Sequence, residues 1–217
     1  MQTTTFTAVF WDFGGVILSS PFDAFNDYER TNGLPIDFIR GVNSRNPDTN
    51  AWALIERREV DAAEFDALFG DESAAAGHRV PGRDVLGMLH GSVRPEMVTA
   101  LDRVIAAGFV TACLTNNVSS DRSADTSDDH ARPEVDAVMA RFDHIIESSK
   151  VGCRKPEPEF YELACTAAGV QPEQVVFLDD LGINLKPARA MGMTTIKVLS
   201  AAQAIADLEG ALAISLA

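Results

Sequence analysis

The sequence contains no stretch of about 18 consecutive apolar residues, the length that a membrane-spanning helix requires. Its first residues, MQTTTFTAVF, include neither basic residues nor a long apolar run, so a secretory signal peptide is not expected. Cysteine is scarce, and the three residues Cys113, Cys153 and Cys165 are odd in number with no CxxC pair. Free thiols in a reducing compartment are the simpler expectation, and we predict a cytoplasmic location.

Positive charge is also scarce, because 18 Lys and Arg residues face 32 Asp and Glu residues, for a formal net charge of −14 at pH 7. Such a chain repels a nucleic-acid backbone or an anionic membrane surface, and we expect neither as a partner. A small phosphorylated molecule can still bind where a metal ion or a lysine makes the local field positive. The remaining composition, 46% hydrophobic and 23% charged over 217 residues, is typical of a folded domain with one sizeable core. The sequence gives no indication of an oligomeric state.

Three short apolar runs, at 7–10, 110–114 and 175–178, each end in a cluster of polar residues. Apolar residues recur at helical spacing between them, at 94–107 and 157–168. Continuous apolar runs separated by helices are typical of parallel strands that are covered on both faces. The alternation therefore predicts an α/β fold built on an open parallel sheet.

The segment 20–85 interrupts this alternation with helix-like stretches such as 50–57. We expect it to be a small α-helical cap domain inserted after the first strand, with 1–19 and 86–217 forming the core domain. A polar, acidic stretch at 119–133 is predicted to be a mobile loop.

Polar side chains follow each of the three predicted strands. Asp12 follows the first strand, Thr115 and Asn116 follow the second, and Asp179 and Asp180 follow the third. In open α/β sheets ligands bind beyond the carboxyl ends of the strands. These five residues are therefore expected to converge on one site.

Four stretches in order, WDFGGVIL, LTNN, SSKVGCRKPEPEFY and VFLDDLGINLKPARAMGMTTIKV, resemble the four motifs of the haloacid-dehalogenase superfamily. The last two are particularly similar to the N-terminal phosphatase domain of soluble epoxide hydrolase and to relatives with a DxGGV first motif. The resemblance covers nearly the whole chain, and the α/β-hydrolase domain that opens epoxides has no counterpart in it. It implies a Rossmann-like parallel sheet with helices on both faces, a small helical cap and a hydrolase activity.

The resemblance implies that Asp12 is the nucleophile, which attacks phosphorus and forms an aspartyl-phosphate that water then hydrolyses. A carboxylate approaching a phosphate dianion is repelled, so a cation is needed between them. Magnesium suits this role because it takes oxygen ligands and needs only a few from the protein. The family pattern assigns it to Asp12, the main-chain carbonyl of Gly14 and Asp180, with Asp179 bound through water or supporting the ligands.

The resemblance implies that the remaining motif residues interact with the phosphate group of the substrate. Thr115 and Asn116 would donate hydrogen bonds to its non-bridging oxygens, as the second motif does. Lys155 would offset the charge of both the nucleophile and the phosphoryl group. Its neighbour Arg154 is expected to be exposed.

The sequence departs from the family at one position. Most phosphatases of this superfamily have a second aspartate two residues after the nucleophile, which protonates the leaving oxygen, but here that residue is Gly14. General acid–base catalysis typically contributes about 10²–10⁴-fold, so the loss matters unless another group replaces it. The replacement can be a water, a cap residue such as Glu56 or Asp23, or the substrate itself.

Three interpretations follow. The first, which we favour, is a magnesium-dependent phosphatase of a small phosphorylated metabolite. The second is a weakly active or inactive protein that binds a phosphate ligand. The third is a dehalogenase that uses Asp12 on carbon; it is ranked last because dehalogenases need no metal, whereas the pair Asp179 and Asp180 is suited to a cation.

Overall fold

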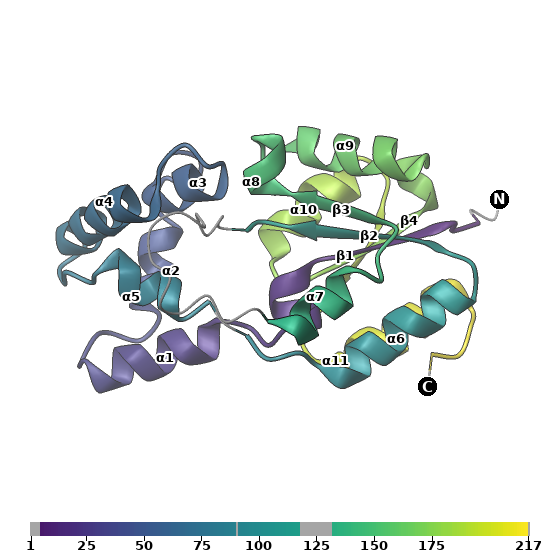
Figure 1. The fold of residues 1–217 in the computed structure, drawn as a ribbon, viewed down its shortest axis with the longest axis horizontal. Helices are drawn as coiled ribbons and strands as arrows, with labels where there is room; N and C mark the ends of the chain where they lie inside the picture. The colour runs from purple at the N-terminus through teal and green to yellow at the C-terminus, as the bar shows by residue number, and fades with distance from the viewer. Residues whose placement is uncertain (1–4, 90, 118–131, 217) are drawn as a thin grey trace.

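A computed structural model of the protein describes residues 5–89, 91–117 and 132–216. Its centre is a five-stranded parallel sheet in the order β3-β2-β1-β4-β5, with helices on both faces and a separate group of helices at one end (Figure 1). The strands are β1 (Ala8–Trp11), β2 (Val110–Thr115), β3 (His144–Glu147), β4 (Val175–Asp179) and β5 (Thr194–Lys197). The predicted α/β fold is confirmed.

Each connection between successive strands contains at least one helix among its described residues. Between β1 and β2 lie the irregular turn η1 (Phe13–Ile17), α1 (Phe22–Thr31), α2 (Phe38–Asn43), α3 (Ala51–Glu56), α4 (Ala62–Ala75), α5 (Gly82–Gly87) and α6 (Pro95–Ala106). The later helices are α7 (Pro133–Met139), α8 (Ser148–Val151), α9 (Pro158–Ala168), the 3₁₀ turn η2 (Pro172–Gln174), α10 (Gly182–Ala190) and α11 (Ala201–Leu212).

The three strands predicted from apolar runs are the three central strands of the sheet. The edge strands β3 and β5 were not predicted, because their sequences HIIE and TTIK contain too few apolar residues to form a continuous apolar run. An edge strand has fewer neighbours, so its residues need not be apolar throughout. The predicted loop at 119–133 lies, up to residue 131, outside the described residues.

The two faces of the sheet have separate hydrophobic cores. Successive side chains of a strand point to opposite faces, and in β1 Val9 and Trp11 pack on the side of α6 and α11 while Ala8 and Phe10 pack on the side of α9 and α10. Figure 1 shows α6 and α11 on one face and α9 on the other. Because both faces are covered, the strand ends are the accessible part of the sheet.

Helices α1 to α5 pack around a third hydrophobic core of their own, which includes Phe25, Ile55 and Phe65. This core also takes in side chains as far along the chain as Leu89, so the boundary predicted at residue 85 falls within α5. The chain passes between the helical group and the sheet where Leu18 pairs with Val93. The division into a core domain and a cap domain stays a prediction.

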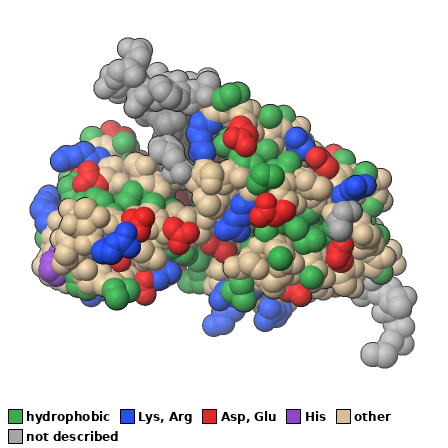
Figure 2. Space-filling view, turned by 90° about the horizontal axis from the view of Figure 1, so that it is seen from below, with side chains coloured by type: hydrophobic (Ala, Val, Ile, Leu, Met, Phe, Trp, Pro, Cys, Tyr) green, Lys and Arg blue, Asp and Glu red, His purple; other side chains and the backbone are tan. Residues whose placement is uncertain are grey.

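The surface carries both signs of charge despite the net charge of −14. On the face drawn in Figure 2, acidic and basic side chains lie interspersed over both parts of the molecule. Within the described residues, no helix has the length and apolar character needed to cross a membrane.

Candidate active site

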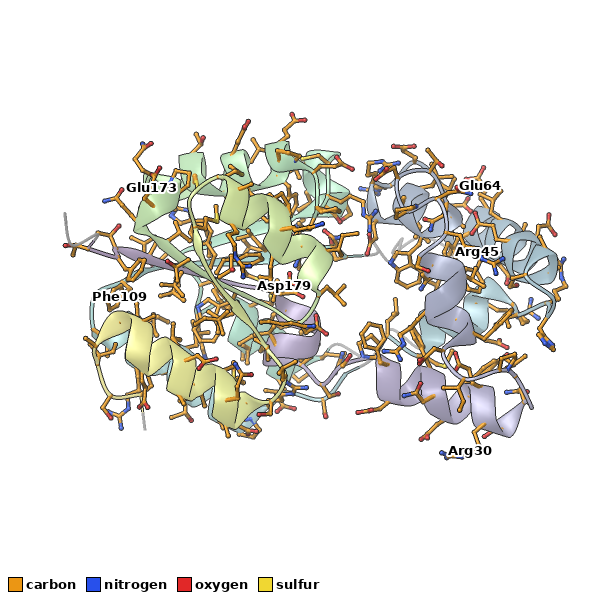
Figure 3. The ribbon with its side chains drawn as sticks, turned by 180° about the vertical axis from the view of Figure 1, so that it is seen from behind. Arg30, Arg45, Glu64, Phe109, Glu173 and Asp179 are labelled. Atoms are coloured by element: carbon orange, nitrogen blue, oxygen red, sulfur yellow. The ribbon has the colours of Figure 1, made fainter. Side chains whose placement is uncertain are left out.

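The carboxyl ends of the central strands bring three acidic residues together. Trp11 is paired with Leu178 across the sheet, so Asp12 and Asp179 follow at the same level of neighbouring strands. One carboxylate oxygen from each of Asp12, Asp179 and Asp180 lies within 4.8 Å of the others. Figure 3 shows Asp179 at the edge of the core that faces the helical group, where Arg45 and Glu64 lie.

The acidic cluster opens onto a cleft of about 1520 Å³ between the sheet and the helical group. From the sheet side the cleft is lined by Asp12, Gly14, Thr115, Asn116, Lys155 and Asp180, and from the helical side by residues that include Phe22, Trp52, Ile55 and Glu56. All the predicted site residues except the buried Asp179 therefore line one cavity. Asp179 lies beneath it.

Lys155 is almost completely buried and joins two of the acids. Its Nζ lies 2.8 Å from Oδ1 of Asp12 and 2.8 Å from Oδ2 of Asp179. Burial by itself lowers the pKa of Lys155, but the two carboxylates outweigh it and raise the pKa above its ordinary value. The lysine is therefore held as a cation, as the resemblance to the family implies.

The acidic cluster carries more negative charge than Lys155 alone offsets. Burial, together with the charges of Asp179 and Asp180, raises the pKa of Asp12 to about 8, and the opposing charge of Lys155 limits the rise. Burial and Asp179 likewise raise the pKa of Asp180 to about 6, against the effect of Lys155 and Arg94. A divalent cation among these oxygens would favour the ionised carboxylates, so this donor set fits a hard, oxygen-binding metal such as magnesium.

Asp179 is fixed by the helix that follows it. Its Oδ1 accepts hydrogen bonds from the main-chain N–H of Leu181 (2.8 Å) and from the Asn184 side chain (3.1 Å), and its Oδ2 also accepts from Asn184 (3.1 Å). The hydroxyl of Tyr161 donates to the Asn184 carbonyl at 2.7 Å. With Lys155 as a further donor, Asp179 is a support for the cluster, in line with the supporting role that the family pattern allowed it.

The two glycines after Asp12 differ in what they require. Gly15 has φ of +76°, and a Cβ there would lie 2.2 Å from Oδ2 of Asp180, so only glycine fits. Gly14 has φ of −69° and ψ of 132°, an extended conformation that is open to any residue, and a Cβ there would have no heavy atom within 4 Å. Neither the backbone nor the space around Gly14 excludes the aspartate that the family usually has.

The side chain of Asn116 forms hydrogen bonds with Lys155 and Glu56. Its side chain accepts a hydrogen bond from the main-chain N–H of Lys155 (2.9 Å) and donates to the Lys155 carbonyl (2.9 Å). It also donates to Oε2 of Glu56 at 3.3 Å. This amide fixes the segment that carries the lysine, and its predicted donation to phosphate stays a prediction.

Arg154 was expected to be exposed, and this expectation is wrong. Its side chain is only 11% exposed, and its Nε forms an ion pair with Oε2 of Glu56 at 2.5 Å. Its Nη1 donates to the carbonyl of Pro47 at 2.9 Å. Arg154 thus joins the core to the helical group, because its partners lie in α3 and in the loop before it.

The two cap residues named as candidate proton donors differ in position. Asp23 is exposed on α1 and does not line the cleft. Glu56 ends α3, is buried and lines the cleft beside Asn116. Burial raises its pKa, although the charge of Arg154 and a hydrogen bond from Trp52 oppose the shift.

Sequence reasoning missed two residues that support the site. Asn184 holds Asp179, and Arg94 donates from Nη1 to the carbonyl of Gly15 at 3.0 Å. Asn184 lies in the quoted fourth motif, but an asparagine in the first turn of a helix is ordinary. Arg94 precedes α6 and carries no local signal, since its partner is 79 residues away.

Comparison with known proteins agrees with this fold and acidic cluster. Residues 6–192 match the family model for haloacid dehalogenase-like hydrolases, and the chain belongs to that family of hydrolases. It is 32% identical over 210 residues to bifunctional epoxide hydrolase 2 of Mus musculus, covering 92% of this chain and 37% of that protein. The chain therefore spans little more than a third of that relative.

Two further proteins match over most of their length. The sesquiterpene phosphatase astK of Aspergillus oryzae is 26% identical over 191 residues, which cover 88% of each chain. A haloacid-dehalogenase-family enzyme of Bacteroides thetaiotaomicron, solved in complex with magnesium and inorganic phosphate, superposes with a TM-score of 0.55 at 19% identity, covering 88% of this chain and 93% of that one. At that identity the superposition shows the fold alone.

Proposed function

We propose that this hydrolase is a magnesium-dependent phosphatase that cleaves a small phosphorylated metabolite through an aspartyl-phosphate on Asp12. The observation that carries the proposal is the acidic cluster joined to a buried lysine. Asp12 offers a carboxylate at the floor of the cleft, 2.8 Å from the Lys155 ammonium. The phosphatase relative of Aspergillus oryzae supports the same class of reaction.

Each site residue has a proposed part. Asp12 attacks phosphorus, and Lys155 offsets the negative charge that builds up on the phosphoryl oxygens. Thr115 and Asn116, which line the cleft at the end of β2, donate to those oxygens. For Asn116 the donor we propose is the main-chain N–H, because the side chain is bonded to Lys155 and Glu56.

Magnesium would be held by the carboxylates of Asp12 and Asp180 and the main-chain carbonyl of Gly14, with Asp179 supporting them. When bound, it would reduce the repulsion between the Asp12 carboxylate and the phosphate, and it would polarise the phosphoryl group. Helices α1 to α5 would act as the cap that closes over the substrate and excludes water. A cytoplasmic location stays a prediction.

The alternative is a protein that binds a phosphate ligand without efficient turnover, and the observation in its favour is Gly14. Phosphate release separates the two. We would measure it from para-nitrophenyl phosphate and a panel of phosphorylated metabolites, with magnesium and with a chelator, for the wild type and for Asp12→Asn. Magnesium-dependent release that the variant loses supports the phosphatase. Absence of release from a chain that still binds magnesium and phosphate supports the alternative.

A further inference from the structure

We propose that Glu56 is the general acid and base of this site, in place of the aspartate that is missing at position 14. This inference rests on the proposed phosphatase function and assigns the one role that the family motifs leave empty here. It concerns the helical group rather than the sheet, because Glu56 is the last residue of α3.

A short series of contacts joins Glu56 to the nucleophile. Oε2 of Glu56 accepts a hydrogen bond from the Asn116 side chain at 3.3 Å, and the same amide bonds both main-chain polar groups of Lys155. The Lys155 ammonium then lies 2.8 Å from Asp12. Glu56 also lines the same cleft as Asp12 and Gly14. Only Asn116 therefore separates Glu56 from Lys155 in this series of contacts.

The direction of the reaction also favours α3. In phosphoryl transfer the attacking and leaving oxygens lie roughly in line on opposite sides of phosphorus. The strands run toward the helical group in Figure 1, so a phosphorus atom attacked by Asp12 presents its leaving oxygen toward those helices. A proton donor for that oxygen is therefore best placed on the helical side of the cleft.

The other carboxyl groups of the described helical group that line the cleft are exposed. Glu59 is exposed and pairs with Arg57, with Oε1 2.6 Å from Nε. Asp61 and Glu64 are exposed and cap the first turn of α4 by bonding each other's main-chain N–H. Glu56 differs from all three because it is buried.

The surroundings of Glu56 suit a group that gives up a proton and takes it back. Burial raises the pKa of Glu56, which favours the protonated acid before the reaction. The charged groups that face it are Arg154 and, at longer range, Lys155, and both lower the pKa. Trp52 donates a hydrogen bond to Oε1 at 2.9 Å. These partners stabilise the carboxylate that forms when the proton leaves.

The proton balance closes over the two steps. In the first, Asp12 forms a bond to phosphorus, the bond between phosphorus and the leaving oxygen breaks, and the Glu56 proton passes to that oxygen to give the alcohol. In the second, water attacks the aspartyl-phosphate, the Asp12 carboxylate is released, and the proton of that water passes to Glu56. The products are the alcohol and inorganic phosphate, and the enzyme returns to its starting state.

The test compares two substrates that differ in their need for an acid. A primary alkyl phosphate releases a strongly basic alkoxide, whereas para-nitrophenyl phosphate releases a phenolate that departs without protonation. Glu56→Gln is expected to lower kcat/KM for the alkyl ester by at least about 10²-fold, which is the usual contribution of acid–base catalysis. The kcat/KM for para-nitrophenyl phosphate should change far less. Glu59→Gln is the matched control, because it makes the same substitution at another glutamate that lines the cleft. It should alter kcat/KM for neither ester.

Two further variants keep the test informative if the glutamine variant folds poorly. Glu56→Asp keeps a carboxyl and should retain more alkyl activity than Glu56→Gln. Adding Gly14→Asp to Glu56→Gln supplies the usual family acid and should restore hydrolysis of the alkyl ester.

Equal losses of kcat/KM for the two esters in a folded Glu56 variant would overturn the inference, and Glu56 would then have only a structural role. A wild type that hydrolyses neither ester with magnesium would overturn the proposed function itself.

Discussion

Gly15 and Asp180 lie so close that a single methyl group cannot fit between them. A Cβ on Gly15 would stand 2.2 Å from Oδ2 of Asp180, and the backbone there is left-handed with φ of +76°. The loop after β1 is thus shaped around a carboxylate that we assign to the metal. The neighbouring Gly14 has an extended backbone and free space.

Gly15→Ala is expected to be destabilising and inactive. The left-handed backbone alone costs a non-glycine residue about 1–3 kcal/mol, and the clash displaces Asp180 as well. Denaturant unfolding and phosphate release measure the two effects. Gly14→Ala is the matched control and should unfold at the same denaturant concentration as the wild type or a slightly higher one, because the extended backbone there accepts alanine. A Gly15→Ala variant as stable as Gly14→Ala would contradict this account of the loop.

Gly14→Asp should fold, because the extended backbone and the empty space accept a side chain. With magnesium present, we expect it to hydrolyse alkyl phosphates at least as fast as the wild type, since it adds a second acid near the leaving oxygen. A steady-state comparison with Gly14→Asn separates the acid from the added volume. Equal activities of the aspartate and asparagine variants would show that the added carboxyl transfers no proton.

Removing the charge of Lys155 leaves two buried carboxylates without their shared partner. Lys155→Met should abolish phosphate release and lower the free energy of unfolding by about 3–5 kcal/mol in the presence of a chelator, as breaking a buried ion pair does. Lys150→Met is the control, because the Lys150 side chain is 71% exposed and pairs with Glu147 at the surface. Equal stabilities of the two variants would argue against the buried cluster.

Magnesium should stabilise the folded chain by binding among the acids. At a concentration 100 times the dissociation constant, the gain in unfolding free energy is about 2.7 kcal/mol. Thermal unfolding with magnesium, compared with potassium at the same ionic strength, measures it. Asp180→Asn should lose this gain. A gain that survives in that variant would place the ion elsewhere.

Arg154→Met is expected to shift the pH dependence of alkyl phosphate hydrolysis. Its guanidinium lowers the pKa of Glu56, so its removal raises that pKa further above the ordinary value. A general acid works while it is protonated, and the rate falls as pH rises through its pKa. The alkaline limb of the alkyl phosphate profile should therefore move to higher pH in Arg154→Met. Arg57→Met, which removes a more exposed link to Glu157, should leave that limb in place.

The central strands and the acidic cluster could be predicted because each has a local signal. Continuous apolar runs mark β1, β2 and β4, and each run ends in the polar residues that form the site. The partners of those residues could not be predicted in the same way. Arg154 looked like a surface arginine because its partner Glu56 lies 98 positions earlier in the chain. Long-range pairs of this kind become visible only when the helical group is packed against the strand ends.

The free space around Gly14 also has a consequence for how this site can change over generations. Every glycine codon becomes an aspartate or a glutamate codon when its middle base changes from G to A. No rearrangement of the loop has to accompany that change, because the backbone at Gly14 is extended and no heavy atom lies within 4 Å of the added carbon. A carboxyl group at this position is thus a single base away, and its gain or loss leaves the surrounding fold intact.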